Sequence, residues 1–160
     1  MLFDIKVFKN SSFKDHRGHY WTSWKKGTNS KIQFKHDKFS LSKKNVLRGL
    51  HGDRKTWKLI SCPYGKFFMV VVDLNKKSKT YLKWDGVTLS ASENKMIYIP
   101  KGVAHGFQTL EEDSWLLYLH TEKYTPGAEK GLNPLDPKLN IKWPKSVVNM
   151  SEKDLSREYL

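Results

Sequence analysis

The chain contains a small set of side chains whose types suit acid–base chemistry. His51 could act as the base, because an imidazole has a pKa near neutrality. Asp154 could orient that ring, while Lys58 could stabilise a developing oxyanion. Tyr118 could act as a second acid that delivers a proton from elsewhere. These four residues are far apart in sequence, so the chemistry requires a fold that brings them together.

Two of these groups lie in one segment, Val46–Leu59, which reads VLRGLHGDRKTWKL. The segment begins as a short strand and breaks at Arg48 and Gly49. In a regular strand Arg48 and His51 would face opposite sides of the sheet. A glycine inside a strand often marks a bulge that re-aims the neighbouring side chains. We therefore expect Gly49 to turn Arg48 and His51 toward one pocket.

The rest of the sequence predicts that strands position these groups. Apolar runs are separated by turn signals at short, regular spacing, which is typical of an all-β sandwich or a cupin-like jelly-roll barrel. The strand-containing segments are Ser11–Trp24, Asn29–Ser42, Cys62–Trp84, Val87–Leu110 and Ser114–Tyr124. Pro100, Gly102 and Gly106 indicate a loop over residues 100–107. A short helix is expected only near the C-terminus, where Ser151 begins a cap and first turn.

Length and composition fit one domain that spans residues 1–160. A chain of 160 residues can bury a core, and its 38% hydrophobic and 13% aromatic residues argue against disorder. No apolar run is long enough for a membrane helix and no signal peptide is visible, so we expect a cytoplasmic protein. The single cysteine, Cys62, excludes an internal disulfide.

The net charge is strongly positive, at +13 from 29 basic and 16 acidic residues. Such a charge attracts polyanions, so nucleic acid must be considered as a partner. The lysines are scattered in pairs and form no long basic block, which favours solvated loops over a nucleic-acid surface. A smaller anion such as a diphosphate would also suit a basic site. We expect neither a nucleic-acid partner nor a membrane partner.

The other histidines raise the question of a metal site. His105 is followed by a glycine, and His120 lies two residues after Tyr118, on the same strand face. A structural role is the simpler explanation for any one of them alone. Metal-binding cupin barrels usually use a His-x-His pair with a nearby glutamate, and the sequence has no His-x-His. We therefore expect no metal and no cofactor, although ligands assembled from distant residues stay an alternative.

Five segments follow one another in an order that resembles a known enzyme family. They are VLRGLH, KLISCPYGKFFMVVVDL, IPKGVAHGF, LLYLHTEKYTPGAE and DPKLNIKWP, within residues 13–154. Together they resemble the dTDP-4-dehydrorhamnose 3,5-epimerase family, metal-independent enzymes of the cupin superfamily. The resemblance implies a nucleotide-diphospho-4-keto sugar as substrate. It also implies removal of a proton beside the C4 ketone and its return on the other face.

The resemblance further implies a role for each candidate residue. His51 matches the general base, and Asp154 matches the carboxylate that orients it. Lys58 matches the lysine that stabilises the enolate oxygen, and Tyr118 matches the acid on the opposite face. The positions that look like substrate-binding residues are Arg48, His105, Arg17, Glu129, Lys153, His36, Lys38 and Tyr124. The family also implies a homodimer whose N-terminal strands exchange between subunits.

Three places depart from the family pattern. At His51 the chain reads LHGD where the family usually reads LHYQ, and the loop that follows is shorter. His36-Asp37-Lys38 stands for Gln-x-Asn, and Thr22 stands for a glutamate. These places look like substrate contacts in the family, so we expect retained chemistry on a changed substrate. The loop HGDRKTWKL resembles GDP-4-keto-heptose epimerases of bacterial capsule synthesis, which favours a GDP-linked heptose over a dTDP-linked hexose.

Two other functions stay open from the sequence. One is a ketoisomerase on a related barrel, which would move the carbonyl from C4 to C3. The other is a non-catalytic barrel that binds sugars or polyanions through its basic surface. The acid–base set argues against the second.

Overall fold

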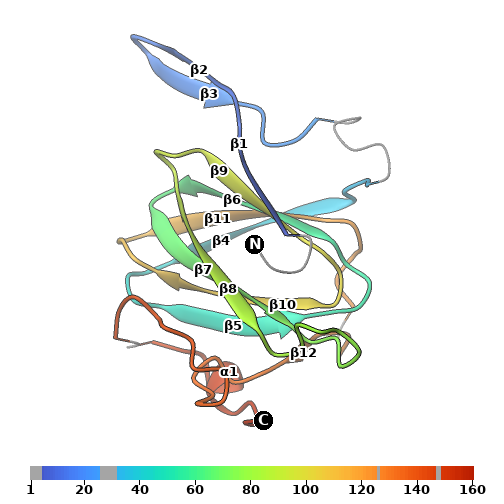
Figure 1. Cartoon of the computed structure of the whole chain (residues 1–160). Coiled ribbons are helices and arrows are strands. Elements are labelled where there is room, and N and C mark those ends of the chain that lie inside the picture. Colours follow the sequence, from blue (N-terminus) through green and yellow to red (C-terminus); the bar gives the residue numbers. More distant parts are fainter. Residues whose placement is uncertain (1–4, 26–31, 126, 147–148) are drawn as a thin grey trace.

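The chain folds as two β-sheets that pack face to face (Figure 1), and the computed structural model describes residues 5–25, 32–125, 127–146 and 149–160. In spatial order, the first sheet contains β1 (Lys6–Lys9), β9 (Lys95–Ile99), β6 (Lys58–Tyr64), β11 (Ser114–His120) and β4 (His36–Ser42). The second contains β12 (Lys130–Gly131), β5 (Leu47–Gly52), β10 (Val103–Thr109), β7 (Lys66–Asp73) and β8 (Trp84–Ser90). The prediction of an all-β fold is confirmed.

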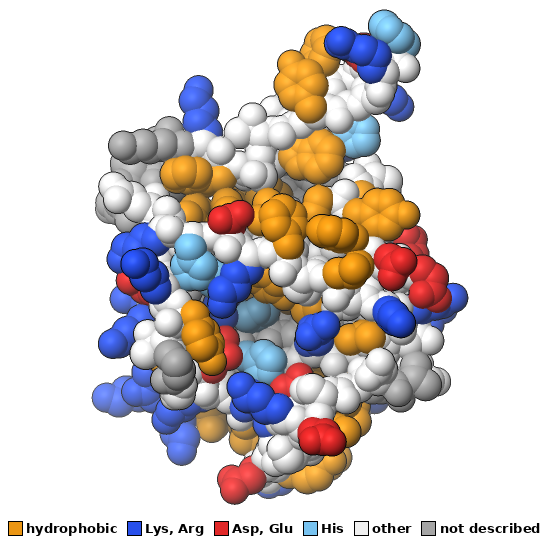
Figure 2. Space-filling view, turned by 180° about the vertical axis from the view of Figure 1, so that it is seen from behind, with side chains coloured by type: hydrophobic (Ala, Val, Ile, Leu, Met, Phe, Trp, Pro, Cys, Tyr) orange, Lys and Arg blue, Asp and Glu red, His pale blue; other side chains and the backbone are white. Residues whose placement is uncertain are grey.

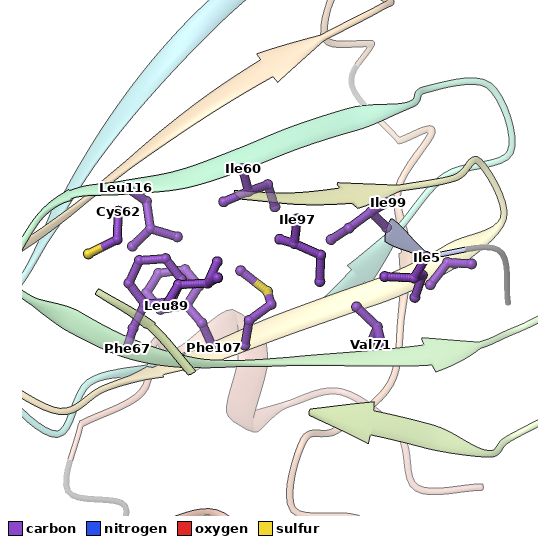
Figure 3. Close-up of a cluster of buried hydrophobic side chains, with 12 residues drawn as sticks. Ile5, Ile60, Cys62, Phe67, Val71, Leu89, Ile97, Ile99, Phe107 and Leu116 are labelled. Atoms are coloured by element: carbon purple, nitrogen blue, oxygen red, sulfur yellow. The ribbon is translucent and has the colours of Figure 1, made fainter. Parts of the chain in front are cut away.

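The hydrophobic core lies between the two sheets (Figure 3). Its buried residues are Ile5, Ile60, Cys62, Phe67, Met69, Val71, Leu89, Ile97, Ile99, Val103, Phe107 and Leu116. Both sheets contribute, because each strand turns alternate side chains inward. This core fixes the two sheets relative to each other and so fixes the residues at their ends.

β7 is apolar on both faces because it packs against two different clusters. Phe67 and Met69 face the core between the sheets. Val70 and Val72 face a second cluster on the outer side, which includes Leu139 from the C-terminal segment. The sequence of β7 therefore reads as a continuous apolar run and not as an alternating one.

The prediction of a loop over residues 100–107 is wrong from residue 103 onward. Residues Val103–Thr109 form β10, which lies between β5 and β7 and is buried along its whole length. Gly106 is not a turn residue. A Cβ atom at this position would lie 2.7 Å from the backbone oxygen of Arg48, so the glycine permits β5 and β10 to approach closely.

Helix is confined to α1 (Glu152–Leu155) within the described residues. The hydroxyl of Ser151 accepts a hydrogen bond of 3.2 Å from the backbone N–H of Asp154, as expected for an N-cap. The predicted cap and first turn are confirmed. Among all the described residues, no helix has the length and apolar character needed to cross a membrane.

A hairpin of β2 (Ser12–Asp15) and β3 (Gly18–Trp21) stands away from the two sheets (Figure 1). Its side chains include the exposed aromatic residues Phe13 and Tyr20. Arg17 lies at its turn and forms an ion pair of 2.7 Å with Asp15. The hairpin therefore exposes aromatic side chains that the described residues of the chain do not cover.

Candidate active site

Strand register gathers several candidate residues on one face of the first sheet. Tyr118 on β11 lies directly across from Lys38 on β4, and His120 lies across from His36. On the other side of β11, His120 lies across from Lys58 on β6. Directly opposed residues point to the same face of a sheet, and so do residues two apart on one strand. All of these side chains therefore share one face.

A bulge in β5 brings Arg48 and His51 toward the same region. Arg48 lies across from Phe107 of β10. His51 lies across from His105, so β5 holds one residue more than β10 between these two pairs. Gly49, inside the bulge, has a φ of +124°, which favours glycine. The bulge expected at this glycine is confirmed.

His51 and Asp154 form a hydrogen-bonded pair. His51 Nε2 lies 2.7 Å from Asp154 Oδ1, and Asp154 Oδ2 accepts a bond of 3.2 Å from the Gly49 N–H. Asp154 is only 4% exposed. Burial alone would raise its pKa, but the bond and charge of His51, with Gly49 and Arg157, hold the pKa at about 2. The carboxylate is therefore ionised at neutral pH and fixes the imidazole ring.

His105 and Tyr118 lie next to this pair in the interior. His105 lies directly across from His51 on the neighbouring strand, and its ring centroid lies 6.2 Å from that of the Tyr118 ring. Burial lowers the pKa of His105 well below its usual value, and the charges of Lys58 and His51 add to this effect. Burial raises the pKa of Tyr118. At neutral pH His105 is a neutral imidazole and Tyr118 a neutral phenol.

Lys58 is a buried cation at the start of β6, with 5% of its surface exposed. Burial lowers its pKa, while the carboxylates of Glu129 and Asp53 act in the opposite direction. No carboxylate of the described residues lies within ion-pair distance of its ammonium group. The ammonium is therefore available to an anionic ligand.

A pocket opens beside Lys58, and His36, Lys38, Tyr124 and Glu129 contribute to its lining. The ammonium of Lys38 lies 4.7 Å from the centroid of the Tyr124 ring, which is a cation–π contact. Figure 2 shows histidine side chains in a hollow that lysine and arginine side chains border. No three His, Cys, Asp or Glu side chains of the described residues are grouped to hold a metal ion. The lining suits an organic anion.

Two predicted site residues lie elsewhere in the single chain. The side chain of Arg17 is 76% exposed in the β2–β3 hairpin, away from the two sheets. Lys153 is exposed on α1, next to the buried Asp154. Neither residue lines the pocket. Of the other predicted site residues, His36, Lys38, Lys58, Tyr124 and Glu129 line the pocket. Arg48 is exposed on β5, and its charge lowers the pKa of Tyr118.

The predicted site residues did not include Arg157, Ser42 or His120. Arg157 Nε donates a hydrogen bond of 3.4 Å to Asp154 Oδ1. Ser42 Oγ accepts a bond of 3.0 Å from Arg48 Nε. His120 lines the pocket, and its alternation with Tyr118 was the one available signal for it. Arg157 and Ser42 had no signal, because only the folded chain brings them to their partners.

Comparison with known proteins assigns the family. The sequence model described as dTDP-4-dehydrorhamnose 3,5-epimerase matches residues 1–160. The chain belongs to this epimerase family. Membership makes it a carbohydrate epimerase of nucleotide-sugar biosynthesis, and the predicted cupin-type jelly roll is confirmed.

Individual relatives agree with the family match. A dTDP-4-dehydrorhamnose 3,5-epimerase of Salmonella typhimurium is 39% identical over 166 residues, covering 98% of this chain and 91% of the relative. A dTDP-6-deoxy-D-glucose-3,5-epimerase of Legionella pneumophila, solved with dTDP-4-keto-L-rhamnose, has a TM-score of 0.94 at 34% identity, covering 99% of this chain and 89% of that one. A 3'-monoepimerase of Streptomyces bikiniensis, solved with dTDP-quinovose, has a TM-score of 0.92 at 27% identity. The match covers 97% of this chain and 82% of that one.

Proposed function

We propose that the chain inverts C3, or both C3 and C5, of a nucleotide-diphosphate-linked 4-keto sugar. The observation that carries the proposal is the His51–Asp154 pair, which lies near a neutral Tyr118 and a buried Lys58. Epimerisation needs a base and an acid on opposite sides of a flat enolate, and a cation for the enolate oxygen. The four side chains are of the types that these roles require.

His51 is the proposed base. Asp154 accepts a hydrogen bond from Nε2–H, which leaves Nδ1 with a lone pair for the substrate. The C4 ketone acidifies the neighbouring C–H bond, because the resulting charge moves to the ketone oxygen. The Asp154 carboxylate then stabilises the imidazolium that forms, and a positioned base of this kind contributes roughly 10²- to 10⁴-fold to the rate.

Lys58 is the proposed partner of the enolate oxygen, and Tyr118 is the proposed acid. A buried ammonium interacts strongly with a developing anion, since the interior screens charges less than water does. Burial keeps the phenol of Tyr118 protonated, so it holds a proton to return on the opposite face. The enolate then returns to a ketone with inverted configuration beside it.

The remaining candidate residues are proposed substrate contacts. Arg48 and Lys38 supply charge for the diphosphate, and Tyr124 lies at the nucleotide end. His36, His105, Glu129 and Lys153 complete the proposed substrate-binding set. Water exclusion by such contacts would strengthen the attraction between Lys58 and the enolate. A cytoplasmic location stays a prediction.

A homodimer with exchanged N-terminal strands is proposed as the active form. The exposed hairpin supports it, and so does a sheet patch of exposed side chains, which are Phe39, Leu41, Tyr64 and Trp115. Figure 2 shows hydrophobic side chains gathered between the hairpin and the hollow. Exchange would offer Arg17 to the partner's pocket. Light scattering during gel filtration should report a dimer, and a monomer at micromolar concentration would contradict the exchange.

Two nucleotide sugars are candidate substrates. Relatives named for dTDP sugars support a dTDP-4-keto-6-deoxy-hexose. A GDP-4-keto-heptose is the second candidate, because Asp53 in the altered loop and the altered residues His36 and Lys38 all line the pocket. Two of the three departures from the family pattern therefore line the pocket.

NMR analysis of products from both sugars tests the proposal. Epimerisation leaves the ketone at C4 and inverts C3 or C5, whereas a ketoisomerase would relocate the ketone to C3. The sugar with the higher kcat/KM is the substrate. If neither sugar is converted by folded protein, the proposal fails. Binding to polyanions that His51→Asn leaves unchanged would favour the non-catalytic alternative.

A further inference from the structure

His120 faces the pocket without a role in the proposed mechanism. It is the last residue of β11, and it lies between His36 on β4 and Lys58 on β6. Both His120 and Lys58 line the pocket. Opposed residues on neighbouring strands have Cβ atoms only about 5 Å apart, so the imidazole and the ammonium can reach one ligand atom together.

Ring packing holds the imidazole of His120 in one orientation. The His36 ring stacks on it, with centroids 4.8 Å apart and planes at 19°. The Tyr118 ring lies 5.8 Å away and is nearly parallel to it, at 4°. A ring held in this way needs little reorganisation when charge develops beside it, which is the property that makes an oxyanion donor effective.

The surroundings of His120 also indicate which ring nitrogen carries the proton. Nδ1 is buried and has no hydrogen-bond partner among the described residues. A buried N–H without an acceptor is rarer in proteins than an acceptor without a donor, so the proton belongs on Nε2. Burial, Lys58, His36 and Lys38 lower the pKa of His120 to about 3, against a smaller opposing effect of Asp53. At neutral pH His120 is therefore a neutral imidazole whose free donor is Nε2–H.

We propose that Nε2–H of His120 donates a hydrogen bond to the C4 oxygen as that oxygen becomes an enolate, beside the ammonium of Lys58. This role rests on the proposed epimerase function and adds a catalytic residue to it. The donor acts most strongly when the oxygen carries full charge. It therefore stabilises the enolate more than the ketone, which raises kcat more than it lowers KM.

Three substitutions separate this role from simple packing. In His120→Gln the amide nitrogen can reach the place of Nε2, so a donor is retained. In His120→Asn the amide lies at the place of the buried Nδ1, so no donor reaches the ligand. His120→Phe keeps an aromatic ring in the stack and removes the donor.

The rate of epimerisation is measured for all variants by NMR with the same 4-keto sugar. We expect kcat to fall roughly 10²-fold for His120→Phe and His120→Asn, with a smaller change in KM, as for the loss of one oxyanion donor. His120→Gln should recover to within about tenfold of the wild type. Thermal unfolding is followed in parallel, and the matched Gln and Asn variants decide the outcome should the Phe variant not fold.

Two results would overturn the inference. In one, His120→Phe keeps at least half of the wild-type kcat. In the other, His120→Gln and His120→Asn lose equal activity, which would indicate a packing role. If wild-type protein converts none of the sugars, the proposed function itself fails and the inference falls with it, so the two failures are distinguishable.

Discussion

Substitution of Asp154 by asparagine should damage both stability and turnover, because its two oxygens accept different donors. Oδ1 faces Nε2 of His51 at 2.7 Å, and Oδ2 faces the N–H of Gly49 at 3.2 Å. The side-chain amide of asparagine has one oxygen, which accepts, and one NH2 group, which donates. If the oxygen faces His51, the amide opposes the N–H of Gly49; if it is flipped, the amide opposes Nε2 and imposes the other tautomer on the base.

The size of the stability effect follows from the pKa of Asp154. That pKa is lowered from 3.8 to about 2, and 1.36 kcal/mol per unit gives about 2 kcal/mol. Because the folded-state pKa is the lower one, this contribution is fully present above pH 4 and is lost as the pH falls from about 4 toward 2. Urea unfolding should thus show Asp154→Asn to be less stable by about 2 kcal/mol at neutral pH, with a smaller difference near pH 3.

Turnover should fall roughly 10²- to 10⁴-fold in the same variant, because a neutral amide no longer stabilises the imidazolium and, when flipped, imposes the wrong tautomer on the base. A matched control is Asp136→Asn. Asp136 is 2% exposed and accepts backbone bonds from Lys138 and Leu160, so it should lose stability and keep its kcat. Wild-type kcat in Asp154→Asn, or a stability difference that does not depend on pH, would refute the reasoning.

Three further outcomes follow from the structure. Tyr118→Phe should lower turnover roughly 10²-fold or more, while the substrate C3 hydrogen should still exchange with deuterated water, as followed by NMR. Normal turnover in this variant would exclude the phenol as the acid. Arg157→Gln removes a cation from Asp154, so the acid limb of the kcat/KM pH profile should move to higher pH, and an unmoved limb would contradict this coupling. Gly106→Ala should destabilise the fold by roughly 1–3 kcal/mol in urea, because the added Cβ would lie 2.7 Å from the backbone oxygen of Arg48; unchanged stability would show that the strands can separate.

Local patterns in the sequence predicted much of the fold. Turn signals separate the strands, Ser151 marks the helix cap, and Gly49 marks the bulge in β5. Strand β10 was missed because glycine is common both in turns and where two strands pack closely. At Gly106 it permits close packing of neighbouring strands, and a turn would leave the same mark in the sequence.

The site was harder to predict than the strands because its contacts are long-range. His51 and Asp154 meet across 103 positions in sequence. Residue types made the two a candidate pair, and only the resemblance to a known family assigned them positions in one site. Arg157 and Ser42 match no motif. They contact Asp154 and Arg48 only in the folded chain. Arg17 lies away from the pocket in the single chain, so a contact with substrate depends on the dimer proposed above.

The central claim is that His51 removes a proton from the carbon beside the C4 ketone. The direct measurement is incorporation of solvent deuterium at C3 of the 4-keto sugar, by wild-type protein and by His51→Asn, with folding checked by thermal unfolding. The account predicts deuterium at C3 with the wild type and a rate lower by roughly 10²-fold or more in the variant. Equal incorporation by both proteins, or none by the wild type, would contradict it.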